Sequence, residues 1–592
     1  MKRILITFAL ILCSTLMLAQ SEQLASDYFK RGEFEKALIE YQKLYTEKPS
    51  TTYLYKIVET LQQLERYTEV QNLLLQRLEK STFPTLMVEL GYNYQLQDSI
   101  EIAKKYYNDA LLKIDEKPIY TSSIARQFEN HSLLDYAISA YKKGAELNPK
   151  QNYNIQLARI YGEQGNVEQM FSNYIDYIET NPSFLNNSKR AFSDFVSENS
   201  ENENNIFLKR LLLKKLQTNP DVYWYELLSW LFVQEKEYNK SFTQEKALYR
   251  RNPESLDRII ELALTTLDEK QYSIATEIFN FVLENSQDIS SLLRAHQFLL
   301  EIETINATKK DFNAINDKYL ALFNQYGRYE QTLSLQIAYG DFLAFHLHKP
   351  EDASKFLKET LNLNVSDFQK ATVKLKLGDV LVYQEKFNEA LIYYSQIQAN
   401  LKNSTISQDA RFKVAKTSYY KGDFDWAESQ LKILKSSTSQ LIANDALDLK
   451  LLISDNKYED SLHVALKLYA KADLMAFQNK TDQAITLLDK ILTEHEGENI
   501  EGQALLMQAQ LFEKKKQYEK ATVNYQKIIT DFSDSILIDD AYYFLAELYN
   551  NILGEPEEAK ALYEKIIFNH QDSIYFVEAR KNFRMLRGDT IN

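Results

Sequence analysis

Between Glu22 and Pro49, apolar residues recur at helical spacing in two runs that are separated by a polar break. The first run covers residues 24–29 and the second covers residues 34–44, with Arg31-Gly32-Glu33 between them. Spacings of three and four residues place apolar side chains on one face of an α-helix, and a proline stops the second helix. The pattern predicts two antiparallel amphipathic helices joined by a short turn.

The same pattern recurs through the first third of the chain. The small position of the second helix falls at steps of 33, 33, 34 and 33 residues, namely at Ala37, Val70, Ala103, Ala137 and Met170. Twelve residues earlier stand mostly small residues: Ala25, Val58, Gly91, Ala125 and Ala158. Four residues later stand large ones: Tyr41, Leu74, Tyr107, Tyr141 and Tyr174. Small residues allow two helices to approach closely while the large residue fills the next layer, so we expect these three positions to form the core.

A second series with a longer period begins near Thr332. Its steps are mostly 37 or 38 residues, with one of 57, and its small positions are Ala353, Ala390, Ala427, Ala484, Ala521 and Ala559. The earlier small partners are Gly340, Gly378, Ala415, Ala472, Ala509 and Ala546, and the large residues are Leu357, Tyr394, Leu431, Leu488, Tyr525 and Tyr563. Between the two series the pattern is weaker, with Ser229 and Ser241 in the two small positions of one unit. These spacings favour two arrays of repeats joined by degenerate repeats.

This combination of small, large and terminating residues resembles the tetratricopeptide repeat, a helix-turn-helix unit of about 34 residues. The resemblance implies an all-α fold, a tetratricopeptide-type helix-turn-helix solenoid in which two arrays are joined by a degenerate middle. We predict five segments: a signal peptide at 1–19, an N-terminal array at 20–182, degenerate helical repeats at 183–331, a C-terminal array at 332–573, and a capping helix with a tail at 574–592. The Asp-Ser loops of the second array also look like those of tetratricopeptide proteins of bacterial envelopes, such as outer-membrane assembly lipoproteins and Tol–Pal coordinators.

The first twenty residues differ from the rest of the chain. Lys2 and Arg3 precede an apolar run from Ile4 to Leu18, and Ala19 follows it. This is the pattern of a secretory signal peptide cleaved after Ala19; an uncleaved membrane anchor is the alternative, although the run is short for a span. We therefore expect a periplasmic or secreted protein of a Gram-negative bacterium, with no integral span in the mature chain.

Composition narrows the possible partners. The formal net charge of −14 becomes −16 once Lys2 and Arg3 are removed, and an acidic surface disfavours nucleic acid. Cys13 is the only cysteine, so a mature chain would have no disulfide or thiolate metal site. We expect a protein or peptide partner, no nucleic acid and no cofactor, and the oligomeric state is open.

Catalytic motifs are lacking in the sequence. It contains no Gly-x-Ser-x-Gly elbow, phosphate-binding loop, dinucleotide fingerprint or zinc-protease helix. His346 and His348 are two residues apart, a spacing that points side chains in different directions on a helix. We predict neither a metal site nor catalytic residues, and we expect that the protein is not an enzyme.

The resemblance indicates where a ligand would bind. In a tetratricopeptide superhelix the first helix of each repeat lines the concave surface, and the residue after its small position should face that groove. In the first array this position holds Ser26, Glu59, Tyr92, Arg126 and Arg159. Arg126 and Arg159 could together hold an acidic group, and Tyr92 could add a flat contact. Local pairing is the alternative, because Glu129 follows Arg126 by three residues and Glu163 follows Arg159 by four.

Three further segments carry expectations. Residues 458–479 contain no helix breaker and predict one long helix across the 57-residue step. Trp224 and Trp230 lie in a helix that is apolar nearly all round, which favours burial over an exposed docking surface. The last helix, 574–587, places Phe576, Val577, Phe583 and Leu586 on one side and three arginines on the other. It reads as a cap, with a basic docking face as the alternative.

These observations favour a non-catalytic protein–protein interaction scaffold of the bacterial cell envelope. It would bind an extended peptide or helix in its concave groove, with envelope assembly or secretion as the setting. A carbohydrate- or peptidoglycan-associated structural module is the alternative, for which aromatic rings in the groove would serve.

Overall fold

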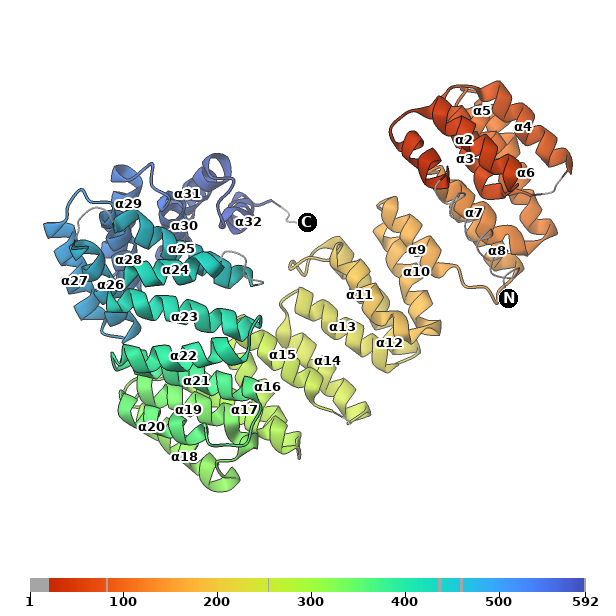
Figure 1. Ribbon diagram of the computed structural model, residues 1–592. Coiled ribbons are helices and arrows are strands. Elements are labelled where there is room, and N and C mark those ends of the chain that lie inside the picture. Colours follow the sequence, from red (N-terminus) through yellow and green to blue (C-terminus); the bar gives the residue numbers. More distant parts are fainter. Residues whose placement is uncertain (1–20, 81–82, 254, 435–438, 458–461, 590–592) are drawn as a thin grey trace, which may run out of the picture. The chain divides into compact units, whose positions relative to one another are not determined.

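The computed structural model describes residues 21–80, 83–253, 255–434, 439–457 and 462–589 (Figure 1). The described residues are mainly helical and include no strand, so the predicted all-α fold is confirmed. The predicted signal peptide, residues 1–19, lies outside the described residues. Within the described part of the chain, no helix combines the length and apolar character that crossing a membrane requires.

The chain divides into two compact units. The first comprises Met1–Val196 and Ser200–Leu227, and the second comprises Ser197–Asn199 and Leu228–Asn592. This division falls within one helix, α13 (Val222–Gln234). The predicted boundaries at 182/183 and 331/332 mark changes in repeat period rather than in compactness, and they stay predictions.

The first unit is a succession of helices in the order that the sequence predicts. After a helix at residues 21–30 come α2 (Phe34–Glu47), α3 (Thr51–Gln63), α4 (Tyr67–Lys80), α5 (Thr85–Gln95), α6 (Ile100–Glu116), α7 (Thr121–Asn130), α8 (Leu134–Leu147), α9 (Asn154–Glu163), α10 (Val167–Thr180), α11 (Leu185–Ser193) and α12 (Glu203–Thr218), with short 3₁₀ turns η1 (Pro118–Tyr120) and η2 (Pro182–Phe184).

The second unit continues with longer helices. It contains α14 (Tyr238–Arg251), α15 (Asp257–Asp268), α16 (Tyr272–Asn285), α17 (Ile289–Asn306), α18 (Phe312–Tyr326), η3 (Glu330–Thr332), α19 (Leu333–Phe345), α20 (Pro350–Thr360), α21 (Asp367–Tyr383), α22 (Phe387–Asn400), α23 (Thr405–Lys421), α24 (Phe424–Leu434), α25 (Gln440–Asn456), α26 (Val464–Phe477), α27 (Thr481–Glu494), α28 (Ile500–Lys514), α29 (Tyr518–Asp531), α30 (Ile538–Leu548), η4 (Tyr549–Leu553), α31 (Pro556–Asn569) and α32 (Phe576–Arg587).

The predicted small and large positions form the core of both units. Every residue assigned to them in the two arrays is buried, at 7% exposure or less for those that carry a hydrophobic side chain. Gly91 shows the reason for the pattern, because a Cβ atom added there would lie 2.5 Å from Cε1 of Tyr107, the large residue of the same repeat. The core is a series of successive clusters rather than one centre, for example residues 25–90 in the first unit and residues 505–548 in the second. This is how a repeat array buries apolar surface.

In the helix pairs that keep the small positions, the turn contains a residue in the left-handed region, five positions before the small residue of the second helix. In the first unit these residues are Gly32, Glu65, Asp98, Ser132 and Gly165, with φ between 56° and 77°. In the second they are Lys236, Lys270, His348, Glu385, Gly422, Asn479, Lys516 and Gly554. One backbone turn therefore repeats along the chain whether or not the residue is glycine.

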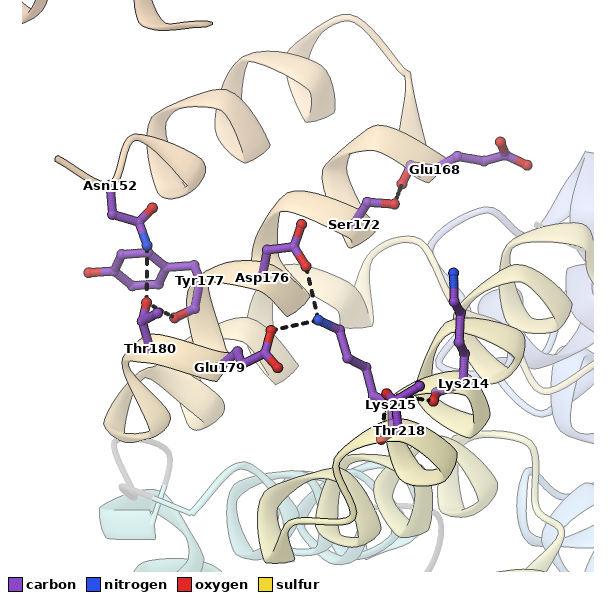
Figure 2. Close-up of polar contacts among 10 residues, drawn as sticks. All are labelled: Asn152, Glu168, Ser172, Asp176, Tyr177, Glu179, Thr180, Lys214, Lys215 and Thr218. Atoms are coloured by element: carbon purple, nitrogen blue, oxygen red, sulfur yellow. Dashed lines mark hydrogen bonds and ion pairs between the residues drawn. The ribbon is translucent and has the colours of Figure 1, made fainter. Parts of the chain in front are cut away.

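An ion pair between helices holds α12 against α10 in the first unit, where the repeat pattern is weak (Figure 2). Nζ of Lys215 lies 3.1 Å from Oδ1 of Asp176 and 2.7 Å from Oε2 of Glu179, both on α10. Burial lowers the pKa of the Lys215 ammonium, but the two carboxylates outweigh burial and the net pKa is raised.

The nearby indole of Trp224 is fully buried, as predicted, whereas Trp230 is half-buried.

Two local predictions are wrong. Residues 458–479 do not form one helix, because α26 begins at Val464 after His463, whose φ is 53°. The 57-residue step instead accommodates an additional helix, α25 (Gln440–Asn456). In the terminal helix α32, Ala579 is buried and Phe583 and Leu586 pack beside it, but Val577 is 71% exposed and does not share that apolar side.

Candidate binding groove

The first helices of three successive repeats border a hollow in the first unit. Residues of α3, α5 and α7, together with residues in the turns after these helices and Tyr67 at the start of α4, line a space of about 790 Å³. A residue that follows a small position is turned by about 100° around the helix axis. At Val58 and Gly91 the small residue faces the partner helix, and the next residues, Glu59 and Tyr92, line the hollow.

A stacked pair of rings forms part of the wall of this hollow. The ring of Tyr92 lies parallel to the imidazole of His131, with 3.9 Å between centroids and 20° between planes. Nε2 of His131 lies 2.8 Å from Oε1 of Glu89, and the side-chain amide of Gln127 donates to the same oxygen. Glu89 is 4% exposed, so its buried carboxylate depends on these two donors. Tyr92 is thereby held in one orientation by residues of the next repeat.

Other polar groups line the same space. Nζ of Lys56 lies 2.7 Å from Oε2 of Glu59, and the hydroxyl of Tyr55 donates to Oγ1 of Thr85 at 2.6 Å. Tyr67 adds a third tyrosine ring to the lining. The hollow therefore offers tyrosine faces and both signs of charge, an arrangement suited to a chain with mixed side chains.

Arg126 and Arg159 do not line this hollow. Nη2 of Arg159 lies 3.0 Å from Oε2 of Glu129, whose Oε1 accepts a hydrogen bond from the hydroxyl of Tyr141 at 2.6 Å. The local pairing considered from the sequence is therefore wrong, since Glu129 pairs with the arginine of the next repeat. Arg126 forms no ion pair with any described residue and is exposed. Burial and Glu129 raise the pKa of the Tyr141 hydroxyl. The positive charges of Arg126 and Arg159 oppose this rise.

Glu89, Gln127 and His131 were not predicted from the sequence. They meet only because two repeats stack, and their separations of 38 and 42 residues do not match the period of 33 or 34 residues of the first array. Tyr92 was predicted to face the groove and does line the hollow. The binding roles of Tyr92, Arg126 and Arg159 stay predictions.

The second unit has its own hollow near its start, of about 560 Å³, between α17, α18, α19 and α21. Nζ of Lys376 lies 2.6 Å from Oδ1 of Asp341 in its wall. Burial raises the pKa of the nearby Glu301 carboxyl and lowers that of the His346 imidazole. Among the described residues, no group of three or more His, Cys, Asp or Glu side chains is placed to hold a metal ion.

Sequence comparison identifies two of the helix pairs. Residues 503–535 and 540–573 match the sequence profile of the tetratricopeptide repeat. These segments coincide with the pairs α28–α29 and α30–α31. The helix pairs of both units have the same small and large core positions. The chain therefore contains tetratricopeptide repeats. Repeats of this class and their fold support a protein–protein interaction scaffold.

Solved structures of low identity also align with the chain. The crystal structure of the APC/C hetero-tetramer Cut9–Hcn1 is 12% identical, with 96% of each chain covered and a TM-score of 0.25. The structure of Naa15/Naa10 bound to HypK-THB is 11% identical, with 97% of this chain and 94% of that chain covered and a TM-score of 0.28. A tetratricopeptide repeat protein from Parabacteroides merdae is 13% identical over 50% of this chain and 97% of that chain, with a TM-score of 0.25. TM-scores this low carry no inference. No curated protein matches the chain.

Proposed function

We propose that this protein is a non-catalytic scaffold of a bacterial cell envelope that binds an extended peptide or helix of a partner protein. The observation that carries the proposal is the hollow in the first unit, where three consecutive first helices present tyrosines and charged groups on one lining. A rigid repeat surface binds without a large ordering cost of its own. The leader-like segment with Lys2, Arg3 and the apolar run to Leu18 supports export to the periplasm or beyond, where envelope assembly or secretion would use such a scaffold.

A crosslinking experiment tests the groove. A photoreactive residue in place of Tyr92 should crosslink to a protein partner in cells. The matched control carries the same residue in place of Ile102, which is 45% exposed on the second helix α6. Crosslinks from both positions alike, or from Ile102 only, would contradict groove binding. Fractionation of the same cells tests the location, since a cytoplasmic pool with an uncleaved leader would contradict export.

A carbohydrate- or peptidoglycan-associated module is the second candidate. Tyr55, Tyr67 and Tyr92 line the hollow, and aromatic faces of this kind stack on sugar rings. Retention of the purified chain on peptidoglycan, lost on Tyr92→Ala but not on Ile102→Ala, would favour this candidate over a protein partner.

A further inference from the structure

The repeats near the end of the second unit border another hollow, which differs in chemistry from the first. It measures about 540 Å³ and is lined by residues of α23, α25, α26, α28 and α30 and of the loops that precede α30 and α32. The additional helix α25, which the repeat spacing did not predict, contributes two of its carboxylates.

Negative charge dominates the lining. Five carboxylates and one ammonium face this space: Asp445, Asp448, Asp473, Asp539, Asp540 and Lys416. Nζ of Lys416 lies 2.6 Å from Oδ2 of Asp473, so these two charges compensate each other. Within the described part of the chain, the other four carboxylates form no ion pair, and only Asp540 accepts a side-chain hydrogen bond, from Tyr575 at 2.8 Å. Four negative charges are thus left without a cation.

A hydroxyl in the wall of the hollow also forms no hydrogen bond within the described part of the chain. Tyr469 on α26 lines the hollow and is 5% exposed. Its hydroxyl forms no hydrogen bond with any of the described residues. A ligand that enters the hollow can satisfy it.

Apolar groups form the floor and the rim. Leu449 and Leu452 are buried in the floor. At the rim, Ile536 and Ile574 are 61% and 74% exposed. Both isoleucines end an Asp-Ser-Ile loop, one repeat apart, and each loop is fixed in the same way.

In the first loop, the backbone N–H of Leu537 donates to Oγ of Ser535 at 3.2 Å. In the second, the N–H of Tyr575 donates to Oγ of Ser573 at 3.1 Å. Two successive repeats therefore present an exposed isoleucine in the same way at the edge of one acidic hollow.

We propose that this hollow docks a Lys- or Arg-containing amphipathic segment of a partner protein, with its cations against Asp445, Asp448, Asp539 and Asp540 and its apolar side against the isoleucine rim. The proposal rests on the scaffold function above and gives one surface a ligand class. Charge complementarity selects this occupant, because an acidic peptide or a nucleic acid would be repelled. A bare cation would leave the two isoleucines uncovered, whereas the long stems of Lys and Arg also cover apolar surface.

Fluorescence anisotropy with short designed peptides tests the docking site on the purified full chain. The probe is a labelled peptide of about four helical turns with Leu on one face and Lys on the other. Two control peptides replace Lys by Glu or Leu by Ser. We expect the Leu/Lys peptide alone to bind well, with an affinity that falls as salt rises from about 50 to 300 mM.

Two variants and a matched control locate the site. Replacing Asp445, Asp448, Asp539 and Asp540 together by Asn should weaken binding by about tenfold or more. The variant Ile536→Ser/Ile574→Ser changes only exposed side chains and should also weaken it. The control replaces four exposed carboxylates outside the lining by Gln: Glu496, Glu519, Glu558 and Glu564. It should bind as the unmodified chain does.

Three outcomes would overturn the proposal. The first is equal binding of the Leu/Lys peptide by the four-Asn variant and the four-Gln control. The second is binding of the peptide in which Glu replaces Lys. The third is undiminished binding of the peptide in which Ser replaces Leu, which would mean a purely electrostatic contact. Competition by Ca²⁺ at low concentration, with no effect of the isoleucine variant, would assign the acidic cluster to a cation instead. Crosslinking at Tyr92 is independent of these variants, so failure here leaves the groove of the first unit standing.

Discussion

A Cβ atom added at Gly378 on α21 would lie 2.3 Å from Cε1 of Tyr394 on α22. Tyr394 is 1% exposed, and its hydroxyl donates to Oδ1 of Asp379 at 2.7 Å, so the ring has no space into which it can move. The absence of a side chain at Gly378 and the size of Tyr394 are therefore one packing arrangement. Gly340 and Leu357 repeat it in the preceding helix pair, with a closest approach of 2.7 Å.

Gly378→Ala should destabilise the second unit. Alanine gains about 1 kcal/mol of helix propensity over glycine, but forcing a methyl group into a packed ring costs about 1–3 kcal/mol, so we expect a net loss of about 1 kcal/mol. Thermal unfolding and amide exchange across α21 and α22 measure it. Gly502→Ala is the control, because its added Cβ would lie 3.4 Å from the nearest atom and should leave stability unchanged or raised. An equal effect of the two substitutions would contradict this packing argument.

The repeat spacing predicted the core because steric contact inside one helix pair leaves a trace at fixed offsets. The positions that Gly91 and Tyr107 occupy are sixteen residues apart in every repeat of the first array. The burial of both residues follows from this pattern alone. The turn conformation left no such trace. Glu65, Asp98 and Ser132 all adopt positive φ, and nothing in these residue types requires it.

The two proposed binding surfaces follow only in part from the sequence. Tyr92 was found because it follows a small position on a first helix, whereas its support by His131 and Glu89 depends on stacking between repeats. The acidic hollow escaped prediction because α25 contributes to it, and the break before α26 contains a left-handed His463 instead of glycine or proline.

The left-handed turns give a second prediction. Gly422 has φ of 84°, and an added Cβ would meet no atom closer than 3.7 Å, so Gly422→Ala isolates the backbone cost. We expect a loss of about 1 kcal/mol. Lys516 occupies the same turn position with φ of 59°, and Lys516→Gly should raise stability by up to about 1 kcal/mol. Chemical denaturation of both variants checks the pair, and the turn model is wrong if both shifts have the same sign.

A buried carboxylate replaces the usual large residue in one repeat of the second unit. Glu245 stands four residues after Ser241 and is 4% exposed. Its Oε1 accepts a hydrogen bond from Ser229 at 2.5 Å, and Arg258 donates to both carboxylate oxygens at 2.6 and 3.0 Å. Oγ of Ser229 and Oγ of Ser241, the serines in the two small positions, lie 2.9 Å apart. This repeat therefore keeps the two small positions and the large position buried, but polar side chains occupy all three.

Arg258→Ala should therefore cost about 2–3 kcal/mol, because it leaves the Glu245 carboxylate buried without its cation. Glu245→Leu restores the apolar residue that other repeats have at this position, and we expect a change below about 1 kcal/mol in either direction. Denaturant unfolding of the two variants and of their combination gives the coupling. If Glu245→Leu proves as costly as Arg258→Ala, the ion pair itself, rather than its unpaired remnant, stabilises the fold.

The acidic hollow predicts a dependence of stability on pH. Burial raises the pKa of the Asp540 carboxyl to about 6 from 3.8; the hydrogen bond from Tyr575 opposes the rise, and the charges of Asp539 and Asp448 add to it. Between these two values the folded chain holds a proton that the unfolded chain has released. The stability that the folded chain gains by keeping Asp540 protonated is thus complete below about pH 3.8. It is lost as pH rises through about 6.

Asp540→Asn removes this loss, since an amide does not ionise and its oxygen still accepts from Tyr575. We expect the variant to have a higher Tm than the unmodified chain at about pH 7.5, and the gap to close near pH 4. Tyr575→Phe should act in the opposite direction, because it removes the hydrogen bond that favours the charged carboxylate and so enlarges the fall in Tm between those pH values. Thermal unfolding of all three chains over this range decides the matter. A gap that stays constant with pH would show that Asp540 acts through packing and not through its charge.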